Sequence, residues 1–453
     1  MPTRRTVLKR VAVGGALLSG PTAWGYRLWQ QQSQRSGQPP QKDRRTVAAI
    51  GIGKRGSELA REASKHARLV AICDVQDNCT AAFLHAWHER LERFRDHREL
   101  LEKVKPDVVA IATPDHWHVP IAIDALQAGC DVYCEKPLTL TIEEGQRIQR
   151  VVEQTGRVLQ VGTQQRSEYG GVFALAAAIV RSGRLGKHVR AHVAIGSPPE
   201  AGLCEPCPMP LAFDWQRWLG SAPRVPYCEE RRKGFRWWFE YAGGKLTDWG
   251  AHHVDIAQWA LGLDHTGPVR VSGTGSLPQI VPENFDWAAF FDGEATLPST
   301  YNTPQRFHVD LRFADGATIG VHHRYTRDDV DFADGVLFEG EADRIFVNRE
   351  KLQGTPVDDL TGGDRRELND LVLSLRKGKP AASHMANFFD CIEDRQQPVS
   401  DVACHPRTVT SCHLCNLAPM LGRDLNWIPG GARFDDDAAN SLIGRGNRQL
   451  ESL

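Results

Sequence analysis

The sequence carries almost no excess of charge of either sign. Its 55 lysines and arginines stand against 56 acidic residues, which gives a formal net charge of -1. A chain without a global positive field has no general means of attracting nucleic acid or an anionic membrane. We therefore expect no nucleic-acid partner and look for recognition at local sites.

The part expected to fold also lacks internal repeats, low-complexity tracts and any apolar run long enough to span a membrane. The chain has 453 residues, of which 41% are hydrophobic. This length is too great for one typical core, and the composition is apolar enough to fold. Two globular domains are the natural expectation.

The N-terminus has a composition of its own. Arg4 and Arg5 stand before a weakly apolar, glycine-containing run over residues 11–24. This pattern is typical of a twin-arginine export signal, so we expect residues 1–45 to be signal and linker and the protein to be periplasmic. The run is too short and glycine-rich for a transmembrane span, so membrane contact is expected only through the signal. Whether the signal is cleaved or stays as a tether is left open.

Eleven cysteines form an odd number spread along the chain, which favours a largely reduced enzyme over a disulfide scaffold. Two C-x-x-C pairs occur, Cys204 with Cys207 and Cys412 with Cys415. A zinc site would need both pairs to meet in space, but the second pair lies in a stretch of helical composition. We therefore expect structural thiols and no metal, while a disulfide between Cys204 and Cys207 stays open.

A strand, a glycine turn and a helix open the folded part. The apolar residues 46–50 run straight into Gly51, Gly53 and Gly56, and helical composition follows. Glycines at these places allow a tight turn, close approach of the backbone to a pyrophosphate, and close helix packing. The pattern predicts a Rossmann dinucleotide-binding domain, which we place at residues 46–165.

The second apolar strand ends in Asp74, about twenty residues beyond the glycine turn. A carboxylate at this position would bond the ribose hydroxyls and repel a 2′-phosphate, which favours NAD as the cofactor. Lys54 and Arg55 in the turn keep NADP open as a second possibility.

Two further loops follow apolar strands of this domain. Residues 113–118 read Thr-Pro-Asp-His-Trp-His, and residues 135–137 read Glu-Lys-Pro. With the glycine turn, and at these separations, the loops resemble the Gfo/Idh/MocA oxidoreductases of the glucose-fructose oxidoreductase and inositol dehydrogenase type. The resemblance implies that Lys136 hydrogen-bonds the reacting substrate oxygen and that the Lys136–Pro137 bond is cis.

The cofactor should be held by the glycine turn, the ribose carboxylate and these two loops. His116 and His118 lack an acidic or thiol partner at metal-ligand spacing, so we assign them to helix capping or to the nicotinamide pocket. The expected cofactor-binding residues are Gly51, Gly53, Gly56, Asp74, Thr113, His116, His118 and Glu135.

An acid-base constellation lies in the second half of the chain. Asp248, His252 and Asp255 recur every three or four residues, which on one helix would place them on one face. The pattern resembles the family's D-x-G-x-H-x-x-D helix, which implies a catalytic dyad of Asp248 and His252, with Asp255 as a substrate ligand. Arg166 is a further candidate substrate ligand, with a structural ion pair as an equal alternative.

Longer segments suited to an antiparallel or mixed sheet follow the first domain. A hairpin is indicated around Ala314, Asp315 and Gly316. We expect an α+β domain with a large, open, mostly antiparallel sheet over residues 166–427 and a tail over residues 428–453. Family resemblance suggests a homodimer or homotetramer formed through that sheet. The aromatic-rich residues 214–238 favour either sugar stacking or core packing.

Three hypotheses of function follow. The first is an NAD-dependent oxidoreductase that moves hydride between a sugar or polyol carbinol and a tightly bound cofactor, with Lys136, Asp248 and His252 as catalytic residues. The second is a redox-neutral glycosidase or lyase that works through a keto-sugar, because free NAD is not expected outside the cytoplasm. The third is a sensor that binds nucleotide or sugar without catalysis.

Overall fold

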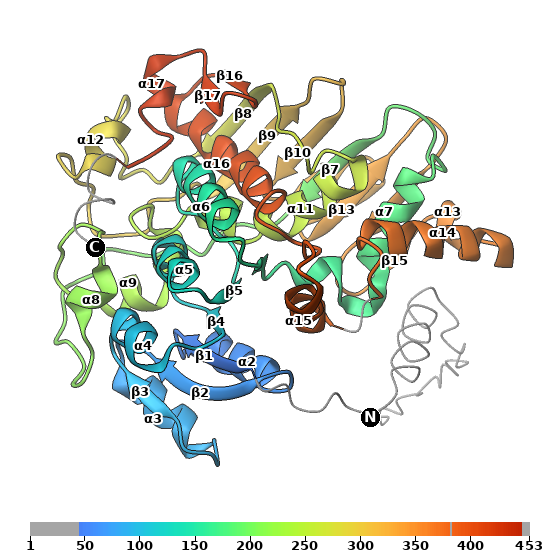
Figure 1. Cartoon of the computed structure of the whole chain (residues 1–453). Coiled ribbons are helices and arrows are strands. Elements are labelled where there is room, and N and C mark those ends of the chain that lie inside the picture. The colour runs from blue at the N-terminus through green and yellow to red at the C-terminus, as the bar shows by residue number, and fades with distance from the viewer. Residues whose placement is uncertain (1–44, 381–382, 446–453) are drawn as a thin grey trace, which may run out of the picture.

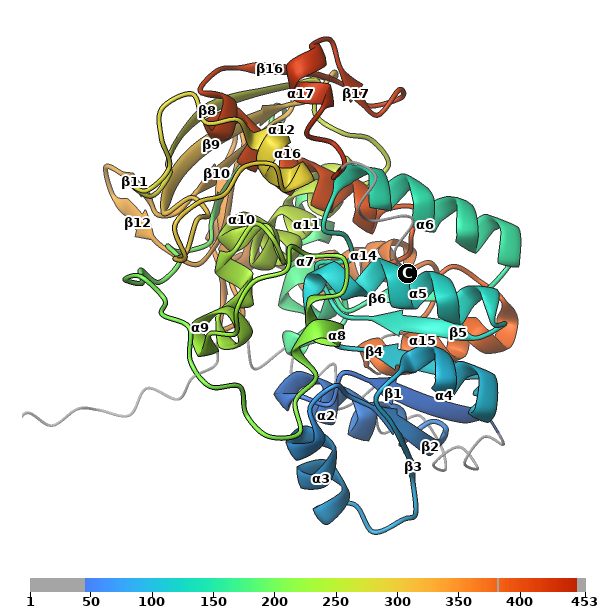
Figure 2. The same cartoon turned by 90° about the vertical axis from the view of Figure 1, so that its left-hand side faces the viewer.

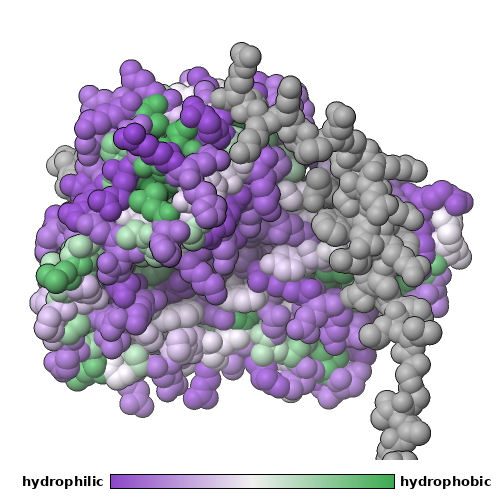
Figure 3. Space-filling view, turned by 90° about the horizontal axis from the view of Figure 1, so that it is seen from below, coloured by the Kyte–Doolittle hydropathy of each residue, from purple (hydrophilic) through white to green (hydrophobic). Residues whose placement is uncertain are grey.

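The computed structural model describes residues 45–380 and 383–445. The predicted twin-arginine signal and the last residues of the predicted tail lie outside this part. Within it, no helix is both long and apolar enough to cross a membrane. The surface seen from below is mostly hydrophilic, with scattered hydrophobic patches (Figure 3).

A parallel six-stranded sheet forms the N-terminal domain and confirms the predicted Rossmann architecture (Figure 1). The strand order is β3-β2-β1-β4-β5-β6, so the order reverses between β1 and β4. In such sheets, ligands bind outside the carboxyl ends of the strands at this reversal. The strands are β1 (Thr46–Ile50), β2 (Arg68–Cys73), β3 (Glu92–Phe94), β4 (Val108–Ile111), β5 (Asp131–Cys134) and β6 (Leu159–Val161).

Apolar packing covers both faces of this sheet. Residues of β1 alternate between two clusters, with Ala48 and Ile50 in one and Val47 and Ala49 in the other. A parallel strand buried on both faces needs this continuous apolar sequence. The helices that follow the strands are α2 (Lys54–Ala63), α3 (Asp77–His85), α4 (His97–Val104), α5 (His118–Gln127) and α6 (Ile142–Thr155).

One helix from far along the chain also packs on this domain. Phe388 and Ile392 of α15 (His384–Asp394) join the cluster that contains Val47 and Tyr133 (Figure 1). The predicted boundary at residue 165 therefore does not separate all the packing, because a helix from beyond it packs on the Rossmann domain. Sequence periodicity shows that α15 is amphipathic without showing which domain it covers.

The C-terminal domain contains a nine-stranded mixed sheet of order β15-β14-β13-β7-β10-β9-β8-β16-β17. Only β7 and β10 pair in parallel among these strands, and the remaining pairs are antiparallel, as predicted. The predicted turn at residues 314–316 joins β9 to β10. The strands are β7 (Arg190–Ala194), β8 (Arg270–Ser276), β9 (Arg306–Arg312), β10 (Thr318–His322), β13 (Gly335–Glu339), β14 (Arg344–Val347), β15 (Leu352–Gln353), β16 (Leu425–Ile428) and β17 (Arg433–Phe434).

Helices cover one face of this sheet, and a short hairpin of β11 (Tyr325–Arg327) and β12 (Val330–Phe332) lies over the other (Figure 2). The large core lies beneath the helices. The helices of this domain are α7 (Val172–Arg181), α10 (Gly244–Asp248), α11 (Gly250–Leu261), α12 (Trp287–Asp292), α13 (Thr355–Asp358), α14 (Gly362–Leu375), α16 (His405–Leu421) and α17 (Asp437–Asn440).

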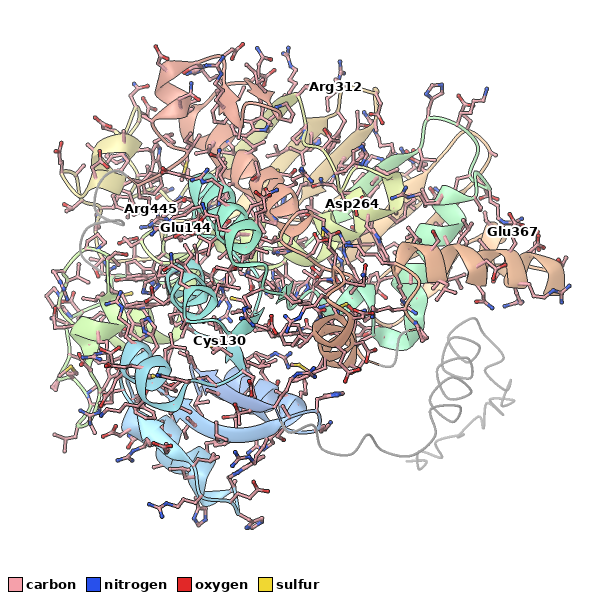
Figure 4. All side chains as sticks on the ribbon, in the orientation of Figure 1. Cys130, Glu144, Asp264, Arg312, Glu367 and Arg445 are labelled. Atoms are coloured by element: carbon pink, nitrogen blue, oxygen red, sulfur yellow. The ribbon has the colours of Figure 1, made fainter. Side chains whose placement is uncertain are left out.

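The predicted tail is part of this domain as far as residue 445. Phe434, Ala439 and Leu442 are buried in the large core. Arg445 donates a hydrogen bond to the main-chain oxygen of Glu240 at 3.0 Å. Figure 4 shows Arg445 next to Glu144 of α6. The prediction of a separate tail over residues 428–453 is therefore wrong as far as residue 445, because a few apolar residues among many polar ones anchor this stretch in the core.

Residues 196–243, which we call the connecting segment, run from the sheet back to the Rossmann domain and include α8 (Trp215–Leu219) and α9 (Glu229–Lys233) (Figure 2). Asp77 N donates to Ala212 O at 3.0 Å, and Asp214 N donates to Val75 O at 2.9 Å. The connecting segment thus pairs with the chain that follows β2. Its aromatic residues form a small core of their own, which includes Trp215, Trp218, Tyr227 and Trp238.

Candidate active site

The glycine turn leaves β1 as the sequence predicts. Gly51 has a positive φ of 81°, a conformation that favours glycine. A Cβ on Gly56 would lie 1.7 Å from the main-chain oxygen of Gly51, so only glycine allows α2 to pack there. A Cβ on Gly53 would meet nothing within 4 Å, because this residue faces an open cleft. Gly51 thus allows the turn, Gly53 leaves space in the cleft, and Gly56 allows close packing of α2.

Asp74 lies beside this turn, at the end of β2. Its Oδ2 accepts a hydrogen bond from Ile52 N at 2.6 Å, and its Oδ1 accepts one from Gln76 N at 2.8 Å. Burial raises the pKa of this carboxyl group, and the two backbone donors oppose that shift. Each oxygen keeps a further lone pair for a ligand hydroxyl.

A cleft of about 590 Å³ runs along the carboxyl end of the parallel sheet. This volume lies within the range of small-molecule and cofactor sites. Its lining includes Gly51, Gly53, Asp74 and Thr113 from the Rossmann domain and Trp218 from the connecting segment. The glycine turn, the carboxylate of Asp74 and a cleft of this volume together fit a dinucleotide.

A second cavity of about 390 Å³ adjoins this cleft. Its lining includes Lys136 and His252. Arg55, Thr113 and Arg236 line both spaces, so the two spaces meet at these side chains. A ligand in the first cleft can therefore present one end to a small molecule in the second.

Lys136 reaches this cavity from the loop after β5. The Lys136–Pro137 bond is cis, as the family resemblance implies. Its Nζ donates hydrogen bonds to Oδ1 of Asp248 at 2.6 Å and to the main-chain oxygen of Asp248 at 2.8 Å. Burial raises the pKa of Asp248, but Lys136 and Arg236 outweigh that effect and hold the pKa below its usual value. Asp248 is thus a carboxylate that positions the ammonium group.

His252 lies on α11, its ring edge-on to Trp249. Its Nδ1 is buried and has no hydrogen-bond partner within residues 45–380 and 383–445. Burial, followed by the charges of Lys136 and Arg349, lowers the pKa of the imidazole well below its usual value. A neutral ring that lines the cavity can accept a proton at neutral pH.

The predicted single helix through Asp248 and His252 is broken at Trp249. α10 ends at Asp248, α11 begins at Gly250, and the described hydrogen bonds do not join the two side chains. The Asp248 carboxylate instead binds Lys136 and, at 3.3 Å, Nε of Arg236. Glycines on both sides of the short α10 were the available signal for this break.

Arg166 and Asp255 lie in the interior rather than at the cavity. Nε and Nη2 of Arg166 each donate to the Asp255 carboxylate at 2.7 Å. Arg166 is 2% exposed and Asp255 is 0% exposed. Because this pair is closed off from solvent, the prediction that both residues bind substrate gives way to the structural ion pair that was the alternative for Arg166.

The two loop histidines take different positions. Nδ1 of His118 lies 2.7 Å from Pro137 O, and its Nε2 lies 2.9 Å from Thr113 O, so the ring joins the two ligand-facing loops. His116 turns away, with Nε2 2.9 Å from Trp218 O, and lines a small separate cavity. His116 therefore positions the connecting segment, and direct contact with the cofactor is not supported for it.

Glu135 lies in the second cavity, where it accepts hydrogen bonds from Arg55 Nε at 2.8 Å and from Gln164 Nε2 at 3.0 Å. Arg55, which lies within the glycine turn, is thus paired with a carboxylate of the protein. Glu135 lines the second cavity alone, while its partner Arg55 lines both spaces, so the assignment of Glu135 to cofactor binding stays a prediction.

Sequence reasoning missed two charged residues of the site. Asp115 lines the second cavity, its Oδ2 has no partner within the described residues, and burial raises its pKa to about 7. Arg236 comes from the connecting segment and lines both spaces. The position of Asp115 inside the Thr-Pro-Asp-His loop was a usable signal, whereas nothing local in the sequence marks Arg236.

Parts of both domains are similar to known proteins. Residues 45–163 match the model of the oxidoreductase family with NAD-binding Rossmann fold, Gfo/Idh/MocA, and residues 201–280 match the model of that family's C-terminal α/β domain. The chain is 29% identical over 147 residues to the inositol 2-dehydrogenase of Salmonella typhimurium, which covers 32% of this chain and 43% of that enzyme. The chain thus spans less than half the length of this curated relative.

Other relatives differ in their reactions. The scyllo-inositol 2-dehydrogenase (NAD(+)) of Bacillus subtilis is 26% identical over 283 residues, which are 58% of this chain and 70% of that enzyme. The α-N-acetylgalactosaminidase of Shewanella oneidensis is 30% identical over 151 residues, 31% of this chain and 32% of that enzyme. The fold is shared with the WlbA dehydrogenase of Bordetella pertussis, at a TM-score of 0.60, 18% identity, and coverage of 86% of this chain and 99% of that one.

Proposed function

Because the chain belongs to the Gfo/Idh/MocA oxidoreductase family, we propose that it is an NAD-dependent oxidoreductase that acts on a carbinol of a sugar, polyol or sugar derivative. One observation carries the proposal: Lys136 and a neutral His252 line a cavity that opens into the dinucleotide cleft. A hydride donor or acceptor and a small hydroxylated substrate would meet at that opening.

The residues present fit the cofactor. Gly51, Gly53 and Gly56 would cradle the pyrophosphate, and Asp74 would accept the ribose hydroxyls, which selects NAD over NADP. When bound, NAD supplies the hydride chemistry. The residues of the protein have two tasks: they move the proton of the substrate hydroxyl, and they stabilise the negative charge that develops on its oxygen.

Two side chains carry these tasks. His252 takes the proton of the substrate hydroxyl as the carbinol is oxidised, and returns it in the reverse direction. Lys136 donates a hydrogen bond to the same oxygen and stabilises the negative charge that develops on it. Asp248 fixes the ammonium group, since it binds Nζ through both a carboxylate and a main-chain oxygen. The low exposure of all three excludes much of the water that would screen these charges.

A second candidate is a redox-neutral cycle that cleaves a glycosidic bond through oxidation, elimination and re-reduction. The likeness to the Shewanella α-N-acetylgalactosaminidase over 151 residues supports it. The paired arginines at residues 4 and 5 add support, because an exported protein would have to keep and reset its cofactor. We include export to the periplasm, and a homodimer or homotetramer built on the large sheet, in the proposal.

Nucleotide analysis tests both candidates. The full chain is purified from its native compartment and denatured, and the released nucleotide is identified by mass spectrometry. Near-stoichiometric NAD from a periplasmic protein would support a retained cofactor and direct substrate screens to glycosides and sugar pairs. An empty protein that reduces added NAD with a polyol would support the simple dehydrogenase. No NAD binding under either condition would contradict the proposed function.

A further inference from the structure

The connecting segment gathers three of the eleven cysteines. Ligand atoms of Cys204, Cys228 and Glu230 all lie within 4.8 Å of one another. Cys207 lies outside this group of ligand atoms, but its main chain is close by, since its N donates to O of Tyr227, the residue before Cys228, at 3.0 Å. Cys204 and Cys228 are buried, while Cys207 and Glu230 are exposed. We propose that these four side chains form a structural site for a thiolate-binding divalent cation, Zn²⁺.

The ligand set has the chemistry of such a site. Structural zinc sites are tetrahedral and are built from thiolates, often from a C-x-x-C pair with further ligands downstream. Here the pair Cys204 and Cys207 is followed by Cys228 and Glu230, three thiols and one carboxylate. Thiolate-rich tetrahedral sets favour zinc over hard cations such as Mg²⁺ or Ca²⁺.

The two buried thiols have a cation close to them in the chain. Cys204 and Cys228 are buried, and Arg231 follows Cys228 by three residues. The neighbouring guanidinium of Arg231 is already committed, because it binds Glu240 at 3.0 Å and lies 3.8 Å above the ring of Trp238. Zn²⁺ would take the place of the thiol protons, and its two positive charges would offset part of the negative charge of the ligands.

A disulfide accounts for the cluster less well. All eleven cysteines are free thiols in the structure. One disulfide would leave the third thiol and the carboxylate without a role, whereas a tetrahedral cation uses all four groups. The expectation of no metal assumed that a zinc site needs both C-x-x-C pairs. The second pair takes no part here, since Cys412 and Cys415 are buried within α16, and Cys228 and Glu230 stand in its place.

The site would brace the wall of the dinucleotide cleft. Cys204 N donates to Ser299 O at 2.7 Å, which ties one end of the loop to the C-terminal domain. Cys228 directly precedes α9, whose Arg232 donates from Nη1 to Gln76 Oε1 at 3.2 Å. Gln76 also binds Asp74 through its main-chain N. A cation at the cluster would therefore hold the connecting segment against the ribose end of the cleft. This inference does not depend on the proposed reaction.

Metal analysis of the full chain tests the site. The protein is purified without chelator, incubated with excess Zn²⁺ under reducing conditions and desalted, and its zinc is measured by mass spectrometry. We expect about one equivalent, with sulfur neighbours at about 2.3 Å in X-ray absorption. Cys204→Ser and Cys228→Ser should each lower the retained zinc at least about tenfold. Cys130→Ser is the matched control, because Cys130 is a buried thiol of the Rossmann domain (Figure 4) that is not among the ligand atoms of the cluster, so this variant should keep full zinc.

A second measurement uses the unaltered chain and stays informative if the serine variants do not fold. Alkylation mapped by peptide mass spectrometry should show that Zn²⁺ protects Cys207, the exposed thiol, and that a chelator restores its reactivity. Absence of retained zinc, equal zinc in the cluster variants, or a disulfide among Cys204, Cys207 and Cys228 in protein from its native compartment would each overturn the proposal.

Discussion

Nζ of Lys136 lies between two oxygens of one residue, the side-chain Oδ1 of Asp248 at 2.6 Å and its main-chain oxygen at 2.8 Å. The two residues are 112 positions apart and belong to different domains. The contact therefore joins the Rossmann loop after β5 to the end of α10, directly at the cavity. Its geometry fixes where positive charge is presented to a substrate oxygen.

Lys136→Gln should remove that charge without opening a large cavity. Loss of one preorganised donor to a developing oxyanion costs roughly 100- to 1000-fold in kcat. We expect a fall of this size in steady-state kinetics on the polyol or sugar found by screening, with nucleotide content unchanged. Asp248→Asn keeps an acceptor at Oδ1 and should cost less than Lys136→Gln. Full kcat in Lys136→Gln would remove this lysine from the reaction.

His252→Asn should lower kcat by roughly 100- to 10,000-fold, since the general base is lost. In the unaltered protein the pKa of His252 lies well below its usual value. The base is therefore deprotonated above that low pKa, and the acid limb of kcat/KM against pH that depends on His252 should fall well below pH 6.5. The control is His253→Asn, because His253 binds Asp334 at 2.9 Å and faces away from the cavity. A limb centred near pH 6.5 would contradict the assignment.

The sequence predicted the elements whose chemistry is local. The glycine turn, Asp74 at the end of the next strand, and the Glu-Lys-Pro loop each depend on residues within one strand and its loop. Their positions in the parallel sheet then follow from strand order alone. The large antiparallel sheet was also predictable, because alternating segments and the turn at residues 314–316 signal it.

Contacts between distant segments could not be predicted in this way. Asp255 and His252 share a local pattern, yet Asp255 is paired with Arg166 through the packing of α11 against η2 (Gln164–Arg166). Arg236 reaches the cavity only because the connecting segment folds back onto the Rossmann domain. Periodicity shows which face of a helix is buried but not which side chain it meets there.

Two alanine substitutions in the glycine turn should separate cofactor binding from folding. A Cβ at Gly53 meets nothing within 4 Å, so Gly53→Ala should leave the melting temperature of the nucleotide-free protein within a few degrees of its original value. The methyl group would occupy space that the pyrophosphate needs, so NAD affinity should fall at least about tenfold in calorimetric titration.

Gly56→Ala serves as the comparison. Its Cβ would lie 1.7 Å from Gly51 O, so the turn or α2 must move and the protein itself should lose stability. If Gly53→Ala binds NAD normally, the pyrophosphate does not lie at this turn.

Asp115→Asn should change how stability depends on pH. Burial raises the pKa of Asp115 to about 7, so the folded state holds a proton that the unfolded state releases near pH 4. The contribution of Asp115 to the free energy of unfolding is full below about pH 4 and declines as pH rises to about 7. The upper limit of this loss is about 4 kcal/mol, from three pKa units at 1.36 kcal/mol each.

The measurement is urea unfolding of both proteins at pH 5 and pH 8. Asparagine does not titrate, so the variant should gain stability relative to the unaltered protein between these two values. Glu144, whose pKa burial also raises to about 7, is present in both proteins and cancels in the difference. An identical pH dependence in the two proteins would show that Asp115 is ionised in the folded state near pH 5.

Asp255→Asn should destabilise the protein and leave the substrate site intact. Residue Asp255 is 0% exposed and its carboxylate accepts two hydrogen bonds of 2.7 Å from Arg166, so the substitution removes the nearer of the two carboxylates that face this buried guanidinium. Breaking a buried pair in this way costs about 3 to 5 kcal/mol. Asp264→Asn is the matched control, since Asp264 lies 3.6 Å from the same arginine and is partly exposed, and its loss should cost much less (Figure 4). Chemical unfolding measures the stability of each variant, and KM measured below the unfolding transition should stay within about twofold of the original. A large rise in KM for Asp255→Asn at unchanged stability would instead show that Asp255 contributes to substrate binding.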